Sequence, residues 1–238
     1  KITYEALQQI DSANEKENFS TVVYSENWHK GVIGIVASRL IESYYRPTLV
    51  FTKSGEKLAA SARSVKGFDI YEALQQCSEF IEQFGGHKYA AGLTLDPKKY
   101  TAFKNKFEKV VEASIDKKLL VPEITIDSRL ELSDITPKFF RILQQMGPFG
   151  PHNMKPVFST SSVRDNGYGK KVGADQNHLK LNIISGADRK TYNAIGFGLG
   201  DKIKMIKNDF DIAYSLDENE WNGMSSIQLV LKDLKKTH

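Results

Sequence analysis

The stretch Phe84–Leu95 reads Phe-Gly-Gly-His-Lys-Tyr-Ala-Ala-Gly-Leu-Thr-Leu and places two adjacent glycines directly before a histidine. Adjacent glycines can take backbone angles that are barred to other residues, so successive N–H groups can point into one concavity and bind an anion. The imidazole of His87 can hydrogen-bond a phosphate oxygen from the rim of such a turn. Ala90, Ala91 and Gly92 carry little bulk, which lets a ligand or a strand approach closely. The stretch therefore predicts a phosphate-binding turn.

A helix is predicted before this turn, from Asp69 to Gln83, with Asp69 as its cap. Its apolar residues fall on one stripe at helical spacing: Ile70, Ala73, Leu74, Cys77, Phe80, Ile81 and Phe84. The helix would lead directly into Gly85 and Gly86. A purely structural role for the motif is the alternative, because a glycine pair ahead of a strand is common as a helix stop and a single histidine is more often structural than catalytic.

The elements upstream indicate a layered α/β arrangement. A strand, a helix and a second strand are predicted over residues 19–25, 30–45 and 47–51. A further short strand is expected over residues 57–64, and its end carries Ser61, Arg63 and Ser64. The N-terminal half is therefore predicted to be an α/β (α+β) domain with a mixed sheet flanked by helices.

A lysine-rich helix is predicted over residues 97–119, with its lysines mainly on a solvated face rather than a DNA-binding one. Thr136 and Pro137 are typical of the start of a later helix, which should end at Met146 and Gly147. Residues 148–153 are dense in proline and glycine and are the best candidate for a domain boundary or an ordered corner. The predicted domains are residues 1–147 and 148–238.

The C-terminal half has short alternating runs of strand-forming residues, separated by Gly, Asp and Asn, with one helix-length insert near residues 201–207. This pattern favours a small all-β barrel of the oligonucleotide-binding (OB) type. Such barrels bind single strands by stacking bases on aromatic side chains beside a basic groove. The candidate residues for that groove are Tyr168, Lys170, Lys171, His178 and Lys180. Surface lysines scattered over a barrel are the alternative.

Composition sets limits on the chain as a whole. It has 238 residues, 40% of them hydrophobic, and 33 Lys and Arg against 29 Asp and Glu, an excess too small to identify a nucleic-acid partner. We expect a cytoplasmic protein with no membrane partner, because no apolar run approaches the roughly 20 residues of a membrane span. One cysteine and scattered histidines predict no disulfide and no metal site. The start at Lys1 suggests a fragment.

Three motifs in order resemble those of one family. Residues 28–40 are similar to its Trp-His-x-Gly-Val-Ile-Gly-Ile helix, residues 61–64 to its Ser-Ala-Arg-Ser segment, and residues 85–92 to its Gly-Gly-His-x-x-Ala-Ala-Gly motif. The family is that of the RecJ-type single-strand-specific 5′-to-3′ DNA exonucleases of the DHH phosphoesterase superfamily, and the chain resembles their C-terminal part. Residues 148–158 and 178–181 resemble its OB domain, although His152 and Met154 depart from the family's pattern.

The resemblance implies a DHH-associated domain followed by an OB domain that binds single-stranded DNA. It also implies that manganese or magnesium is held in an N-terminal domain with an Asp-His-His motif, which does not occur here. No cofactor and no complete catalytic set are then expected within this chain. The N-terminal DHH domain of the same protein, a single-strand-binding protein and a helicase are the implied protein partners, in DNA repair and recombination.

On this resemblance, the phosphates of the DNA would be held by six residues of the first domain: Ser61, Arg63, Ser64, Gly85, Gly86 and His87. Arg63 would grip a phosphate through its planar fork. Two alternatives remain. One is a single-strand-binding module with no chemistry of its own. The other is a phosphodiesterase of the same superfamily that acts on short oligonucleotides or cyclic dinucleotides, against which the barrel argues because so short a substrate leaves a long groove empty.

Overall fold

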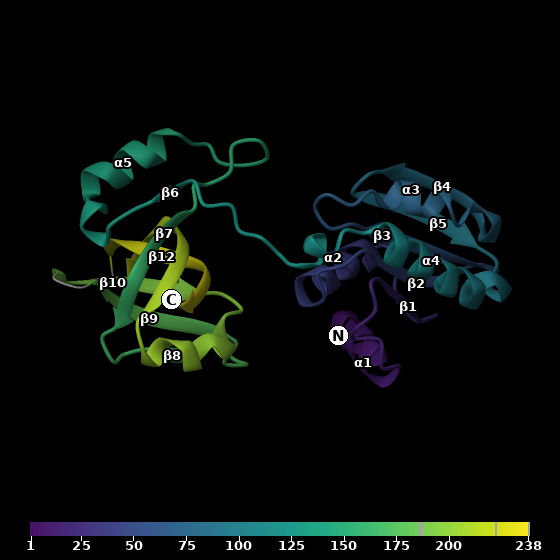
Figure 1. Ribbon diagram of the computed structural model, residues 1–238, viewed down its shortest axis with the longest axis horizontal. Coiled ribbons are helices and arrows are strands. Elements are labelled where there is room, and N and C mark those ends of the chain that lie inside the picture. Colours follow the sequence, from purple (N-terminus) through teal and green to yellow (C-terminus); the bar gives the residue numbers. More distant parts are fainter. Residues whose placement is uncertain (186–187, 222, 238) are drawn as a thin grey trace. The chain divides into compact units, whose positions relative to one another are not determined.

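The computed structural model describes residues 1–185, 188–221 and 223–237 and divides into two compact units, Lys1–Pro122 and Glu123–His238. Figure 1 shows the first unit as a sheet between helices and the second as a barrel with the helix α5 beside it. No helix of the described residues is long and apolar enough to cross a membrane.

The first unit is built on one mixed five-stranded sheet. Its strands lie in the order β1-β2-β3-β5-β4, with β1 and β2 parallel and the other neighbours antiparallel. The strands are β1 Thr21–Tyr24, β2 Thr48–Ser54, β3 Lys57–Arg63, β4 Ile81–His87 and β5 Ala90–Leu95. The helices are α1 Ile2–Ser12, α2 Ile33–Ser43, α3 Ile70–Gln75 and α4 Tyr100–Ser114, with short 3-10 turns η1 Ser78–Phe80, η2 Pro97–Lys99 and η3 Lys117–Leu120. The predicted mixed sheet flanked by helices is confirmed.

Two apolar cores lie on opposite faces of this sheet. On one face, α1 and α2 pack against β1 and β2, where Val23 and Val50 are buried. On the other, α3 and α4 pack against all five strands through residues such as Phe103 and Phe107. Because successive strand residues point to opposite faces, Ser61, which pairs with Val50, lies on the α2 face of the sheet.

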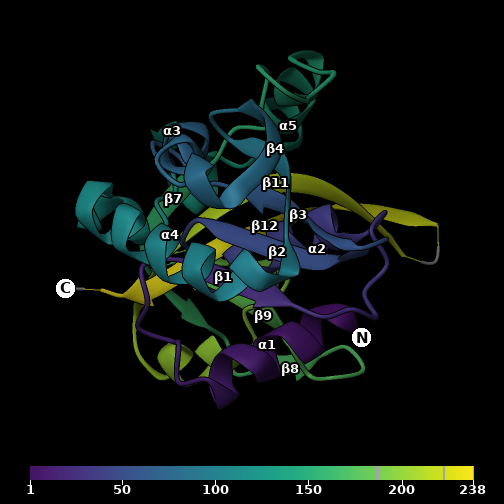
Figure 2. The ribbon, with the colours of Figure 1, turned by 90° about the vertical axis from the view of Figure 1, so that its right-hand side faces the viewer.

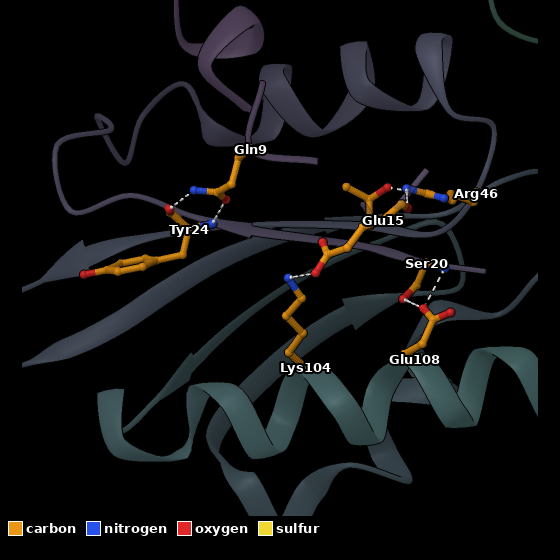
Figure 3. Close-up of polar contacts among 8 residues, drawn as sticks. Gln9, Glu15, Ser20, Tyr24, Arg46, Lys104 and Glu108 are labelled. Atoms are coloured by element: carbon orange, nitrogen blue, oxygen red, sulfur yellow. Dashed lines mark hydrogen bonds and ion pairs between the residues drawn. The ribbon is translucent and has the colours of Figure 1, made fainter. Parts of the chain in front are cut away.

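Polar contacts fasten the first strand to its surroundings, as Figure 3 shows. Arg46 is only 4% exposed and donates to the Thr21 hydroxyl and to the carbonyls of Glu15, Lys16 and Asn18. From α4, Glu108 accepts from the backbone N–H and the hydroxyl of Ser20, at 2.9 and 2.5 Å. Because each partner of the buried Arg46 guanidinium is a hydrogen-bond acceptor, its positive charge is compensated. These groups are structural.

The segment between residues 69 and 87 differs from the prediction. Asp69 does cap a helix, because its side chain accepts from the N–H groups of residues 71 and 72, but α3 ends at Gln75. The chain then makes η1 and enters β4, so Gly85, Gly86 and His87 lie in a strand. The reason is that Phe80 from η1 and Ile81 and Phe84 from β4 still reach the core, while the glycine pair disfavours helix and pairing with β5 satisfies the backbone.

The second unit is a closed barrel. β7 pairs with β9 and β11, β9 with β10, β10 with β12, and β12 with β11, which makes a ring of five strands. Within this ring every pair is antiparallel except β10–β12, an arrangement typical of the OB fold, as the sequence predicts. The strands are β6 Ser128–Arg129, β7 Phe158–Asp165, β8 Lys170–Val172, β9 His178–Ser185, β10 Asp188–Gly196, β11 Phe210–Trp221 and β12 Met224–Lys236. The helical elements are η4 Leu132–Asp134, α5 Pro137–Gln145 and η5 Gly200–Lys207, and Figure 2 shows β11 and β12 as one long hairpin.

The boundary between the units lies earlier than the predicted one between residues 147 and 148. Leu132, Ile135, Phe140 and Leu143 are buried in the same core as the barrel strands, so the helix α5 belongs to the second unit. Thr136 caps α5 by accepting from the N–H of Phe139 at 3.1 Å, as expected. The proline-rich segment is an ordered corner, the second of the two predicted alternatives, since the Asn153 amide donates to two backbone carbonyls, each at 2.9 Å.

Candidate functional sites

Strands β3, β5 and β4 bring the residues of two distant motifs into adjacent rows on one face of the first sheet. Ser61 pairs with Gly92, which pairs with Gly85. One row further on, Arg63 pairs with Ala90, which pairs with His87. Directly opposed residues of antiparallel strands point to the same face, and neighbouring strands lie about 4.8 Å apart. Arg63 and His87 therefore project from the same face of the sheet, with Ala90 of β5 between them.

We call the row Ser61, Gly92 and Gly85, together with Ala90, the shelf. A Cβ atom on Gly85 would meet nothing within 4 Å, and one on Gly92 would meet only the Ala60 carbonyl at 3.8 Å. Neither glycine has the positive φ that requires glycine. The packing of this chain thus gives no reason for glycine at either position, and the result is a flat, exposed surface on which another group can lie in contact with the backbone.

Gly86 is glycine for a different reason. Its φ is +146°, and a Cβ atom there would lie 2.3 Å from the Ala90 carbonyl oxygen. The predicted phosphate-binding turn at Gly85 and Gly86 is not formed, because successive N–H groups of a strand point to opposite sides. The turn of this hairpin is at residues 88–89 instead.

Arg63 lies at the end of β3 with much of its hydrogen-bonding capacity free. Its Nη1 donates to the Ser61 hydroxyl at 3.0 Å and to the Ala62 carbonyl at 2.8 Å. Within the described ranges Arg63 has no acidic partner and no acceptor for Nη2. Gly34 of α2 makes room for this guanidinium, because a Cβ atom there would lie 2.9 Å from Nη2. The glycine inside the helix is thus explained by Arg63.

The two predicted serines differ in what their hydroxyls can do. Ser61 accepts from Arg63, so its own proton is left to donate. Ser64 donates its proton to the Phe68 carbonyl at 2.9 Å and closes the turn before α3. Only Ser61 lies on the shelf.

His87 is exposed, and its Nδ1 accepts from the backbone N–H of Tyr89 at 3.3 Å. In a neutral imidazole with Nδ1 as the acceptor, the proton is on Nε2. The ring can therefore donate from Nε2 toward a group held beside Arg63.

A groove of about 950 Å³ borders the shelf and is lined by Lys30, Gln83, Gly85, Gly92 and Thr94 among others. Arg63 and His87 are not among its lining residues and lie in the next row. Lys30, which precedes α2, adds a positive charge to the groove. No local pattern singles out Lys30, because only the sheet brings it to the glycines.

The outer face of the barrel carries the second candidate site. On β9, Leu179, Leu181 and Ile183 are buried, so His178 and Lys180 point outward. Lys170 of β8 lies directly opposite Lys180. Like charges in this position destabilise a sheet by up to about 1 kcal/mol, and neither lysine has an acidic partner in the part of the chain that the structure describes. Such a pair is suited to an anion.

The other residues predicted for this face are placed differently. Lys171 points the other way and forms an ion pair with Asp201 at 3.0 Å. Tyr168, just before β8, is 72% exposed. His178 accepts at Nδ1 from the N–H of Gly198 at 3.1 Å and contacts the ring of Phe197 edge to face, with centroids 5.3 Å apart.

Phe197 is the residue that sequence reasoning missed. It follows β10 directly and is 62% exposed. A phenylalanine at the end of an apolar run is usually counted with the core. The one signal in the sequence is its position between two glycines, Gly196 and Gly198.

Comparisons with known proteins identify both units. Residues 17–113 match the DHHA1 domain and residues 126–233 the RecJ OB domain. The single-stranded-DNA-specific exonuclease RecJ of Bacillus subtilis is 30% identical over 98% of this chain and 30% of that protein. The enzyme of the same name from Escherichia coli is 28% identical over 89% of this chain and 37% of its own length. The chain spans about a third of the curated relatives it matches.

A solved structure agrees over both units. The crystal structure of RecJ from Thermus thermophilus in complex with Mg²⁺ aligns with 97% of this chain and 36% of its own, with a TM-score of 0.76 and 26% identity. A second structure of the same protein, in complex with Mn²⁺, gives the same TM-score.

Proposed function

Because the chain belongs to the RecJ family, of which it spans the DHHA1 and RecJ OB domains, we propose that it is the DNA-holding part of a single-stranded-DNA-specific 5′-to-3′ exonuclease. The observation that carries the proposal is the placement of Arg63 and His87 at either end of the row that passes through Ala90 of the shelf. The complete protein would be a phosphodiester hydrolase of DNA repair and recombination.

The reacting metal ions belong elsewhere in this proposal. Among the described residues no group of three or more His, Cys, Asp and Glu could hold a metal ion, so the residues here do not fit a metal centre. The related structures contain Mg²⁺ or Mn²⁺. We assign these ions to a DHH domain of the complete enzyme and give this chain the task of binding and orienting the phosphates that the metal centre acts on.

Each residue of the first site has a distinct role. Arg63 binds a phosphate with its free Nη2 and Nε donors, and the Ser61 hydroxyl adds a third contact. His87 donates from Nε2 to the same or the neighbouring phosphate and stabilises its charge. Gly85 and Gly92 let the sugar-phosphate backbone lie against the sheet. Gly86 shapes the hairpin and Ser64 the turn, so neither is expected to touch DNA.

The test of this site uses the complete enzyme. Arg63→Ala and His87→Ala should each lower the rate of digestion of 5′-labelled single-stranded DNA by about 10²- to 10³-fold, because one charge-stabilising donor has that effect in other enzymes. Arg63→Lys should recover only part of the loss, since lysine lacks the fork. Ser64→Ala is the matched control and should stay within a few-fold of wild type. Wild-type rates in both alanine variants would exclude the assignment.

The barrel would hold the single strand beyond the reacting phosphate. Lys170 and Lys180 provide the charge, and Lys171 contributes less because Asp201 already neutralises it; His178 lies beside them on β9. Binding through phosphate contacts weakens with salt. By itself, the chain is then a single-strand-binding module, and incubation with labelled DNA and Mn²⁺ should give binding without cleavage. Cleavage by the purified chain would place a metal site within it.

A further inference from the structure

Two exposed aromatic side chains of the barrel are each enclosed between glycines. The sequence is Gly167-Tyr168-Gly169 before β8 and Gly196-Phe197-Gly198 after β10. The aromatic residues are 72% and 62% exposed. The two glycines of each triplet differ in their structural role.

One glycine of each triplet lies against the barrel interior. A Cβ atom on Gly169 would lie 2.4 Å from Cδ1 of Ile206, and one on Gly196 would lie 2.8 Å from Cδ1 of Leu199. Both neighbours belong to the segment around η5 that packs on the core. The backbone is thus pressed onto the core at these glycines. Since successive residues point to opposite sides, Tyr168 and Phe197 are directed outward.

The other glycine of each triplet has a left-handed backbone, with φ of +96° at Gly167 and +74° at Gly198. Only glycine adopts such angles readily. The triplets therefore have opposite order, since the left-handed glycine precedes Tyr168 and follows Phe197. In both loops an exposed aromatic residue thus lies between one glycine packed on the core and one glycine with a left-handed backbone.

Further contacts fix the backbone around Tyr168 and the ring of Phe197. The Asp165 carboxylate accepts from the N–H groups of Gly167 and Gly169, at 2.9 and 2.7 Å, and so closes the loop around Tyr168. His178 does the same for Phe197, through its edge-to-face contact and its hydrogen bond from Gly198. An aromatic ring that is exposed yet fixed loses little entropy when a flat ligand stacks on it.

The two rings lie on either side of the opposed lysines. Lys170 and Lys180 pair with each other, and Lys180 also pairs with Ile195. Tyr168 comes before this row, ahead of β8, and Phe197 comes after it, past the end of β10. A single strand that crosses the row would place phosphates at the lysines and bases at both rings.

We propose that Tyr168 and Phe197 are paired base-stacking residues of the barrel, with Asp165 and His178 as the residues that position them. The ligand is single-stranded DNA of any sequence, because every base offers a flat face. The proposal rests on the proposed function of the barrel and adds a second aromatic contact to it.

The test measures binding of the purified chain to a fluorescein-labelled 15-mer of thymidine by anisotropy at low salt. Tyr168→Ala and Phe197→Ala should each weaken binding by about 5- to 100-fold, the range found for loss of one stacked base. Phe197→Tyr should bind as wild type, which shows that the fold tolerates substitution there. Tyr4→Ala is the matched control, because Tyr4 is 64% exposed in the first unit without flanking glycines, and it should bind as wild type.

A strand of the same length without bases separates stacking from charge. It should bind wild type and Phe197→Ala equally. An equal loss on both strands would overturn stacking, and so would wild-type affinity of both alanine variants for the thymidine strand. If the wild-type chain itself binds neither strand, the proposed function of the barrel fails together with this inference.

The positioning role of Asp165 has its own readout. Asp165→Ala should weaken binding to the thymidine strand but not to the strand without bases, and adding Tyr168→Ala to it should cause little further loss. Additive losses would show that Asp165 acts independently of Tyr168.

Discussion

The shelf of the first unit and the outer face of the barrel suit DNA in opposite ways. The shelf is made by leaving side chains out, with Gly85, Gly92 and Ala90 beside one arginine. The barrel face is made by adding them, as aromatic rings and lysines that project from the strands. A bare surface accepts a ligand in one close position, whereas projecting rings and charges accept a strand in many. The first suits chemistry at a defined phosphate and the second suits retention of a long strand.

The largest expected effect is of an added side chain on the shelf. Gly92→Val in the complete enzyme should lower the rate of digestion by at least about 100-fold, because displacing a phosphate by about 1 Å is enough for such a loss. The fold should tolerate valine, since a Cβ atom there meets only a carbonyl at 3.8 Å and valine favours strands. Thermal unfolding is the control. A wild-type rate would mean that nothing lies flat on the shelf.

Gly86 is needed for folding, whereas Gly85 is free of such constraints and, in the proposed function, faces the ligand. Gly86→Ala should destabilise the first unit by about 3 kcal/mol, from its backbone angle and the contact with the Ala90 carbonyl, and lower its melting midpoint by about 10 °C. Gly85→Ala, with open space around it, should change stability by less than about 0.5 kcal/mol. Equal losses of stability in the two variants would show that Gly85 and Gly86 do not differ in their importance for folding.

The reactivity of Cys77 can measure how Gly86→Ala and Gly85→Ala affect the stability of the first unit. It is the one cysteine of the chain and is buried, and burial raises the pKa of its thiol to about 11. At pH 8 the thiol is therefore protonated and inaccessible, and a thiol reagent should react with it only when the first unit opens. Gly86→Ala should speed this reaction, while Gly85→Ala should not.

The lysines of the barrel should have smaller and more uniform effects. Lys170→Ala and Lys180→Ala should each weaken DNA binding by less than about tenfold and lower the slope of log affinity against log salt by about 0.7, as expected for loss of one phosphate contact. Lys171→Ala is the control with the same charge change, and its slope should change less because Asp201 pairs with it at 3.0 Å. Three equal slopes would argue against a defined path for the strand.

The smallest effect concerns stability without DNA. Lys180→Thr should stabilise the second unit by a few tenths of a kcal/mol at low salt, because it removes one of two like charges that lie opposite each other. The gain should vanish at 1 M salt, where charges are screened within about 3 Å. Calorimetry at both salt concentrations would measure it. A loss of stability would show that the lysines are already neutralised within the protein.

Much of the fold could be read from local patterns. The alternation of apolar residues predicted most strands, and Thr136 and Pro137 marked the start of α5 correctly. Strands near residues 158–236, separated by glycine and acidic residues, predicted the barrel. These features depend on a few neighbouring residues, so the sequence by itself determined them. The residue types of both sites were equally visible, because Arg63, His87 and the lysines are chemically distinct wherever they fold.

Tertiary structure decided how those residues are used. Phe80, Ile81 and Phe84 fit a helical stripe, and only pairing with β5 turned the segment into a strand and Gly85 into part of a shelf. The helix α5 likewise packs into the core of the barrel, so the boundary between the units lies before α5, whereas the sequence predicts it after this helix. The choice of Ser61 over Ser64 and the exposure of Phe197 follow from contacts with residues distant in the chain. Local sequence cannot specify such pairings, because their free energy exists only once the strands have come together.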